Sequence, residues 1–121
     1  MFYMKKIDLN IGDTIFVYRY TNKSMKNDYP ESVVLNKDNI INHWKGRYVT
    51  QYVIIDGIKI KVNFFGNPGT PFSTIVRLSK DNSIILSSSY NVCKARIKLE
   101  YNRIDKLLRK QYGGKIKGIQ K

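Results

Sequence analysis

Short apolar runs, separated by clusters of Gly, Asn, Asp, Pro and Ser, recur along this chain of 121 residues. Runs of this length that are rich in β-branched and aromatic residues are typical of β-strands. The pattern predicts strands at residues 5–9, 14–20, 31–35, 48–55, 58–65, 73–78 and 84–89. Residues 40–44 fit either a helical turn or a further strand. Loops are expected at 21–30 and at 66–72, where two prolines and two glycines constrain the chain.

The clearest local signal is Asp56-Gly57, which lies between two of the predicted strands. This residue pair is preferred in the two-residue type I′ turn of a β-hairpin. Such a turn places Ile55 opposite Ile58 and makes one face of the ladder almost wholly apolar, so that face must point into the core. The opposite face is then expected to present Tyr48, Tyr52, Lys59 and Lys61.

The segment from Cys93 onward fits two structures. Apolar and polar residues alternate over 93–101, which is typical of a strand, while apolar residues also recur at helical intervals from Cys93 to Leu108. The complete alternation favours a strand over 93–101. A helix over 103–112 would follow, capped by Asn102 and ended by Gly113-Gly114. One long helix is the alternative.

These elements predict a mainly β fold, a β-barrel or sandwich of SH3-like or OB-like size, with one C-terminal α-helix. Gly12-Asp13 before Ile15-Phe16-Val17 resembles the opening of an SH3-like or similar small barrel, over too short a stretch to name a family. We expect a single β-rich domain with its helix over residues 1–114 and a basic tail over 115–121.

Cysteine content and hydropathy suggest where the protein resides. The single cysteine excludes an intramolecular disulfide and fits a reducing compartment. No apolar run reaches the roughly 18 to 20 residues needed to cross a bilayer, and no signal-peptide pattern opens the chain. We therefore expect a soluble cytoplasmic protein without a membrane partner. If the gene belongs to a phage, the setting would be the host cytoplasm or the virion.

The net charge is the most unusual property of the composition. Twenty-two Lys and Arg against nine Asp and Glu give a net charge of +13. A strongly positive field attracts polyanions such as nucleic acid. An AT-rich coding sequence would explain the abundance of Lys, Ile, Asn and Tyr, but it does not explain the shortage of acids. The charge therefore favours a functional role.

Cations concentrate in the last third of the chain, where Glu100 and Asp105 alone offset them from residue 94 onward. Such concentration favours contact with phosphates, although a solvated charged surface is the ordinary alternative. The predicted basic strip comprises Lys94, Arg96, Lys98, Arg103, Lys106, Arg109, Lys110, Lys115 and Lys117. Tyrosine rings on the hairpin could stack on bases. We expect the cations to lie on one side of a β scaffold, with single-stranded nucleic acid or RNA as the favoured partner.

Catalytic signals are weak. His43 is the sole histidine and Cys93 the sole cysteine, and neither lies in a recognisable motif. One His and one Cys cannot form a Cys/His zinc cluster. The glycines of residues 66–69 lack the ending of a phosphate-binding loop, and the serines of 87–89 lack the glycines of a nucleophile elbow. We expect no catalytic centre, no metal and no cofactor.

The leading hypothesis is a small non-catalytic basic protein that binds nucleic acid, alone or as a subunit of a nucleoprotein assembly. A bacteriophage structural protein, such as an auxiliary capsid or tail subunit, is the main alternative. In that case the two loops and the exposed tyrosines would contact other protein subunits. A small phage-encoded inhibitor acting by protein–protein contact is a further alternative.

Overall fold

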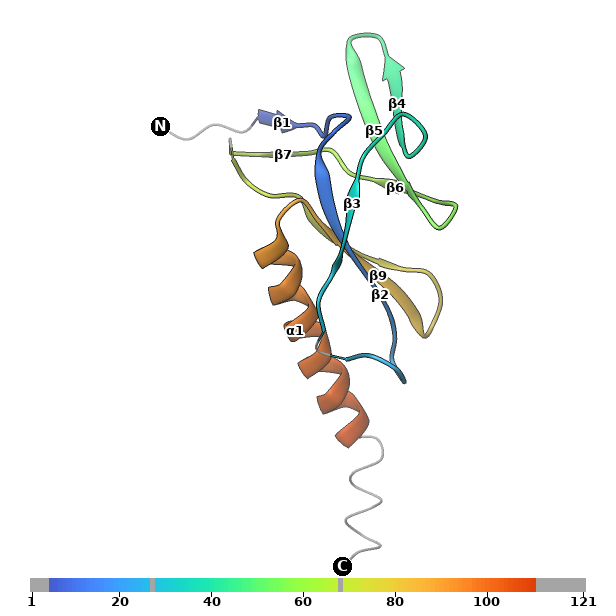
Figure 1. Ribbon diagram of the computed structural model, residues 1–121, viewed down its shortest axis with the longest axis vertical. Helices are drawn as coiled ribbons and strands as arrows, with labels where there is room; N and C mark the ends of the chain where they lie inside the picture. The colour runs from blue at the N-terminus through green and yellow to red at the C-terminus, as the bar shows by residue number, and fades with distance from the viewer. Residues whose placement is uncertain (1–4, 27, 68, 111–121) are drawn as a thin grey trace, which may run out of the picture.

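The computed structural model describes residues 5–26, 28–67 and 69–110 and shows a mainly β fold with one C-terminal helix, as predicted (Figure 1). The strands are β1 (Lys5–Ile7), β2 (Thr14–Thr21), β3 (Glu31–Val34), β4 (Ile40–Lys45), β5 (Tyr48–Ile55), β6 (Ile58–Lys61), β7 (Phe64–Gly66), β8 (Ser73–Arg77) and β9 (Asn82–Ser87). The helix is α1 (Tyr90–Leu108). No helix within the described ranges has the length and apolarity needed to span a bilayer.

The strands form three antiparallel sheets. The central sheet has the order β3-β2-β9-β8, the outer sheet has the order β4-β5-β6, and β1 pairs with β7 in a small third sheet. The outer sheet packs on the central sheet, so the arrangement is like a sandwich. Of the two forms that the sequence allows, the described strands therefore adopt the sandwich and do not close into a barrel.

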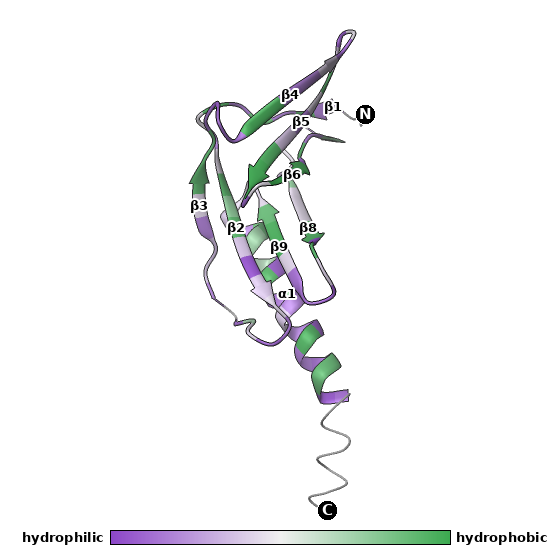
Figure 2. Ribbon diagram, turned by 90° about the vertical axis from the view of Figure 1, so that its right-hand side faces the viewer, coloured by the Kyte–Doolittle hydropathy of each residue, from purple (hydrophilic) through white to green (hydrophobic). Residues whose placement is uncertain are grey.

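The central sheet is covered on both of its faces. One face meets the outer sheet in a first core, in which Ile84 and Leu86 of β9 pack with Val53 and Ile60. The other face meets α1 in a second core that includes Ile85. Side chains alternate between the two faces of a strand, so the outer sheet and α1 lie on opposite sides of β9. Figures 1 and 2 show the helix against β2 and β9, away from β4 and β5.

The β5–β6 hairpin confirms the predicted turn and register. Asp56 and Gly57 both have positive φ, 54° and 77°, as a type I′ turn requires. Ile55 pairs with Ile58. The predicted strand over 58–65 is nevertheless too long, because β6 ends at Lys61 and residues from Phe64 pair with β1. The break falls at buried Asn63, whose side-chain amide donates to the Val49 carbonyl at 2.8 Å.

Residues 40–44, whose sequence fits either a helical turn or a strand, belong to strand β4. This strand pairs with β5, and Lys45 lies opposite Tyr48 across a two-residue turn. Gly46, the first residue of the turn, has a φ of 62°. A positive φ at this position is typical of a type II′ hairpin turn.

The predicted strand over 93–101 is wrong, as is the predicted helix start at Arg103. One helix runs from Tyr90 to Leu108, and the hydroxyl of Ser89 caps it by accepting from the Val92 amide at 3.3 Å. Residues 93–101 form a helix and not a strand because the second face of the central sheet needs an apolar cover. Cys93, Ile97 and Ile104 provide that cover. The predicted helix end at Gly113-Gly114 and the basic tail lie outside the described residues.

Candidate nucleic-acid interface

The outward surface of the outer sheet gathers aromatic and cationic side chains from three strands. Val53 and Ile55 of β5 point into the first core, so the alternate residues Tyr48 and Tyr52 point away from it. The pairing of β5 with its neighbours then aligns further side chains on the same surface. We call this surface the hairpin face and define it by His43, Lys45, Tyr48, Tyr52, Lys59 and Lys61.

The rings and ammonium groups of the hairpin face lie close together. Lys45 is opposite Tyr48, and Lys61 is opposite Tyr52. The Nζ atom of Lys59 lies 4.5 Å from the centre of the Tyr52 ring. Tyr48 is 69% exposed, which leaves most of its ring accessible to a ligand. All four residues that the sequence predicts for this surface therefore lie on it, and Tyr52, Lys59 and Lys61 are direct neighbours.

No acidic residue offsets these cations within the sheet. The strands β4, β5 and β6, all of whose residues are described, contain neither Asp nor Glu. The nearest acid along the chain, Asp56 in the turn, is hydrogen-bonded to Arg19 of the central sheet at 3.1 Å. The salt bridges between described residues involve none of the three lysines. Their charge is available to an external anion.

Sequence reasoning missed the contribution of β4. Lys45 and His43 were not expected on this surface, because β4 was not identified as a strand paired with β5. The glycine at position 46, first of two residues between β-rich segments, is the signal that could have found the pairing. Trp44 was missed for the same reason. It is 63% exposed at the end of the β4–β5 hairpin that projects from the top of Figure 1.

A second basic surface covers the solvent side of α1. We call it the helix face and define it by Lys94, Arg96, Lys98, Lys106, Arg109 and Lys110. The predicted strand would have placed Lys94, Arg96 and Lys98 in one row. In a helix each residue advances by about 100°, so Arg96 and Lys98 lie on different sides of the solvent surface. The helix face is therefore broad and is not a linear strip.

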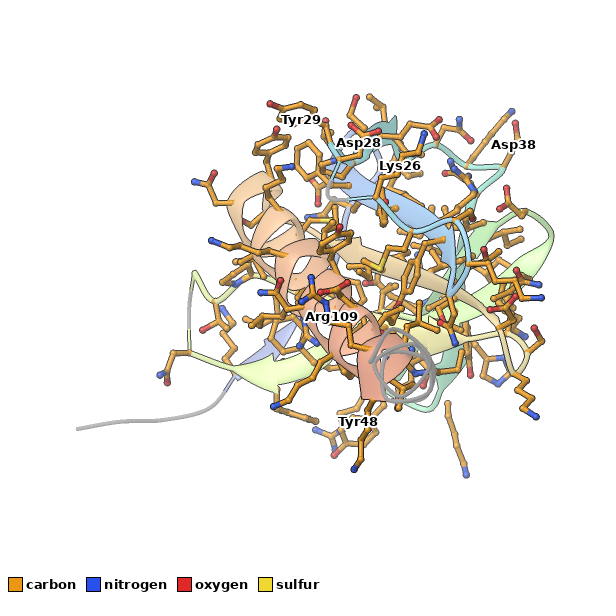
Figure 3. The ribbon with its side chains drawn as sticks, turned by 90° about the horizontal axis from the view of Figure 1, so that it is seen from below. Lys26, Asp28, Tyr29, Asp38, Tyr48 and Arg109 are labelled. Carbon is orange, nitrogen blue, oxygen red and sulfur yellow. The ribbon has the colours of Figure 1, made fainter. Side chains whose placement is uncertain are left out.

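Two members of the helix face are bonded to described neighbours. The Nζ atom of Lys94 lies 4.1 Å above the Tyr29 ring and donates to the Asp28 carbonyl at 2.7 Å. Arg109 forms a salt bridge with Asp105 at 3.1 Å. Figure 3 looks along the molecule from the end where α1 stops and labels Tyr29, Asp28 and Arg109. The carboxylate of Asp105 thus compensates the charge of Arg109, whereas the contacts of Lys94 hold its ammonium group in place without an acidic partner.

Arg103 has a different position from the one expected. It does not belong to the helix face but to a charge cluster around buried Glu100, the Glu100 cluster, with Tyr20 and Arg77. Both arginine side chains of the cluster are about half exposed. Glu100 Oε1 accepts from Tyr20 Oη at 2.6 Å, from Arg77 Nη1 at 2.8 Å and from Arg103 Nη2 at 2.8 Å. Arg103 Nε also donates to Glu100 Oε2 at 3.0 Å.

The Glu100 cluster fixes the ionisation of its members. Hydrogen bonds from Arg103, Arg77 and Tyr20 lower the pKa of Glu100 to about 2, against an opposing effect of burial. Burial, followed by the hydrogen bond to Glu100, raises the pKa of Tyr20 to about 12. At neutral pH the cluster therefore holds one carboxylate, two guanidinium groups and a neutral phenol.

The two basic surfaces do not form one interface. The hairpin face lies on the outer sheet and the helix face lies on α1, with the central sheet between them. In Figure 3, Tyr48 of the hairpin face and Tyr29 beside Lys94 lie toward opposite edges of the molecule. The expectation that all cations share one side of the scaffold is wrong, because α1 and the outer sheet cover opposite faces of β9. Lys115 and Lys117 lie outside the described residues.

The two residues considered for nucleophilic chemistry occupy separate environments. His43 is exposed on β4, whereas Cys93 of α1 is fully buried. Burial raises the pKa of the Cys93 thiol to about 11, so the thiol is protonated at neutral pH. The described residues contain no group of three or more His, Cys, Asp or Glu side chains arranged to hold a metal ion.

Comparisons of this chain with protein-family models, with curated proteins and with solved structures find no match.

Proposed function

We propose that this protein is a small non-catalytic nucleic-acid-binding protein that holds a single strand across the hairpin face. The observation that carries the proposal is an acid-free sheet surface on which exposed Tyr48 and half-buried Tyr52 lie beside lysines that form no salt bridge with a described residue. Aromatic rings stack on bases at about 1–3 kcal/mol per base, and ammonium groups bind phosphates. The protein could act alone or within a nucleoprotein assembly.

The spacing of the rings favours a single strand over a duplex. Tyr48 and Tyr52 are four residues apart on β5, a separation of roughly 13 Å along an extended strand. Stacked bases rise by only about 3.4 Å per residue in a duplex strand. Two bases on these rings would therefore belong to an unstacked, extended chain. Lys45, Lys59 and Lys61 would contact the phosphates between and beside them.

A binding titration tests this proposal. Fluorescence anisotropy with labelled single-stranded RNA, single-stranded DNA and duplex DNA should show tighter binding of the single strands at low salt. The logarithm of the binding constant should fall linearly with the logarithm of salt concentration. Absence of binding to any of these probes at low salt would refute the proposal.

A matched pair of double variants locates the interface. Changing Lys59 and Lys61 to Gln should lower the salt slope for a single strand by about 0.7 for each phosphate that is no longer neutralised. Changing Lys98 and Lys106 of the helix face to Gln removes the same charge from the other side of the molecule and should leave the slope nearly unchanged. An equal effect of both double variants would contradict binding on the hairpin face.

One observation favours a second candidate function, that of a structural subunit such as an auxiliary phage capsid or tail protein. β4 is an edge strand of the outer sheet, and Trp44 near its end is 63% exposed. Edge strands pair readily with other chains, and aromatic residues are enriched at protein interfaces. This function predicts self-association that Trp44→Ser abolishes in analytical ultracentrifugation. If the protein is monomeric at high concentration, this candidate loses its support as a self-assembling subunit.

We propose the cytoplasm as the setting of the protein, that of the host if a phage encodes it. The support is its single cysteine, which lies fully buried in the second core as a thiol and suits a reducing compartment.

A further inference from the structure

A pocket of about 700 Å³ opens where α1 approaches its C-terminal end, and the proposed function does not use it. Its walls come from the last turns of α1, from the β8–β9 hairpin and from the loop that follows β2. The residues that matter most for its chemistry are Lys23, Arg77, Lys80, Arg103, Leu107 and Leu108. Four cationic side chains therefore surround a space that also has an apolar wall. The pocket adjoins α1, on the opposite side of the central sheet from the outer sheet.

The two arginines in the pocket wall are fixed by a buried carboxylate. Buried Glu100 accepts a hydrogen bond from each guanidinium group, at 2.8 Å in both cases. Every hydrogen bond that Arg77 donates to a described residue leaves from Nη1, and Arg103 uses Nε and Nη2. Arg77 Nε and Nη2 and Arg103 Nη1 can therefore donate to a ligand. A planar guanidinium group whose orientation is already fixed loses little freedom when it binds an oxyanion.

Charge in the pocket favours an anion. The acid in the wall, Asp81, accepts a hydrogen bond from the backbone N–H of Asn22 at 2.9 Å, and Glu100 is paired with the two arginines. Lys23 and Lys80 are exposed at the rim and add two further positive charges. The dipole of α1 opposes an anion at the C-terminal end of the helix, but this effect is confined to the last turn. Arg103 lies before that turn.

The volume points to a ligand larger than a phosphate ion. Pockets of roughly 300–1,000 Å³ accommodate small organic molecules, and the leucine wall suits a planar or apolar group. Arginine pairs with phosphate oxygens through two parallel hydrogen bonds. We infer that this pocket binds a phosphate monoester with a planar body, of the nucleoside 5′-monophosphate class. The phosphate would lie on Arg77 and Arg103, and the base would lie against Leu107 and Leu108.

Calorimetric titration with adenosine 5′-monophosphate tests the inference. The nucleotide should bind saturably and at least tenfold more tightly than adenosine, which lacks the phosphate, or inorganic phosphate, which lacks the planar body. A 5′-phosphorylated oligonucleotide compared with its 5′-hydroxyl form distinguishes two sources of the same chemistry. A preference for the phosphorylated strand indicates a strand end as the ligand, and equal binding of the two strands indicates a free nucleotide.

Variants at the rim keep the test independent of folding, because removal of Arg103 would take two of the four hydrogen bonds from the buried carboxylate of Glu100. Lys80→Gln and Lys23→Gln should each weaken nucleotide binding by about 3- to 10-fold, whereas Lys98→Gln, on the same helix but outside the pocket, should not. Arg77→Lys keeps the charge but loses the planar pair of donors, and should weaken binding about 10-fold. Thermal unfolding would confirm that each variant is folded.

The outcome that overturns the inference is an absence of saturable nucleotide binding, or binding that Lys98→Gln weakens as much as Lys80→Gln does. The test of nucleotide binding in the pocket can fail or succeed independently of strand binding on the hairpin face. Substitutions on the hairpin face should leave nucleotide binding unchanged, and Lys80→Gln should leave the binding of a 5′-hydroxyl oligonucleotide unchanged.

Discussion

The hairpin face and the helix face are both positively charged, but their cations differ in the partners that they have within the protein. Lysines of the hairpin face lie on strands without acids and beside exposed Tyr48 and half-buried Tyr52. On α1 the cations are more numerous, yet Arg109 is paired with Asp105, and the ammonium group of Lys94 already donates to the Asp28 carbonyl. Arg103 is paired with the buried carboxylate of Glu100. The larger count of cations therefore does not identify the better interface for nucleic acid.

This difference shows what a count of charges along a sequence leaves out. A cation that already has a carboxylate partner contributes less to the binding of an external phosphate, because part of its charge is compensated. A lysine beside an aromatic ring on an acid-free surface keeps its charge and adds a stacking platform. The fold decides which of these two situations each cation occupies.

The largest expected effect tests the hairpin face directly. Tyr48→Ala combined with Tyr52→Ala should weaken single-strand binding by about 2–4 kcal/mol, or roughly 30- to 1,000-fold, because two stacking platforms are removed. Anisotropy titration measures the change. Tyr29→Ala is the matched control, since Tyr29 is similarly exposed beside the helix face. A loss of affinity in the control as large as in the double variant would show that the helix face takes part.

The next effect separates stability from binding. Glu100→Gln leaves two arginines and Tyr20 around a neutral amide, and should lower the free energy of unfolding by about 3 kcal/mol. Chemical denaturation measures this change. Oligonucleotide binding at a temperature where the variant is folded should be unaltered, because Glu100 lies on the other side of the central sheet from the hairpin face. Unchanged stability would mean that the cluster contributes little to the fold.

The smallest effect is a pH dependence that follows from the same cluster. The folded pKa of Glu100, about 2, lies below the ordinary glutamate value of 4.5. Its contribution to stability is therefore complete above pH 4.5 and is lost as the pH falls toward 2, by about 2 kcal/mol at pH 3. The difference in unfolding free energy between wild type and Glu100→Gln should shrink accordingly between pH 5 and pH 3. A constant difference over this range would contradict the depressed pKa.

Much of the sheet structure could be predicted from local sequence. Asp56-Gly57 determined both the turn and the register of β5 with β6, because a two-residue turn with positive φ leaves one alignment of the flanking strands. The start of α1 could not be predicted in this way. Residues 93–101 satisfy strand and helix periodicity together, and the choice depends on the uncovered face of the central sheet around Ile85, which no local pattern shows.

The candidate site was predictable to a smaller extent. The four residues of β5 and β6 on the hairpin face follow from the register of one hairpin. Lys45 follows only when β4 is recognised as its neighbour. The contact of Arg103 with the Glu100 cluster could not be predicted from neighbouring residues in the sequence. The other two members that bind Glu100, Tyr20 and Arg77, are 80 and 23 residues away from it in the chain.

The burial of β9 on both faces has a consequence for motion within the molecule. Ser83 to Ser87 are all buried, and β9 is paired with β2 on one side and β8 on the other. Amide protons along this strand should exchange with deuterated solvent only when the whole domain opens. Those near the end of the β4–β5 hairpin, where β4 is largely exposed, should exchange through small local openings. The part of the hairpin face that carries Lys45 and Tyr48 is therefore expected to open more readily than β9, to which the first core anchors the rest of that face.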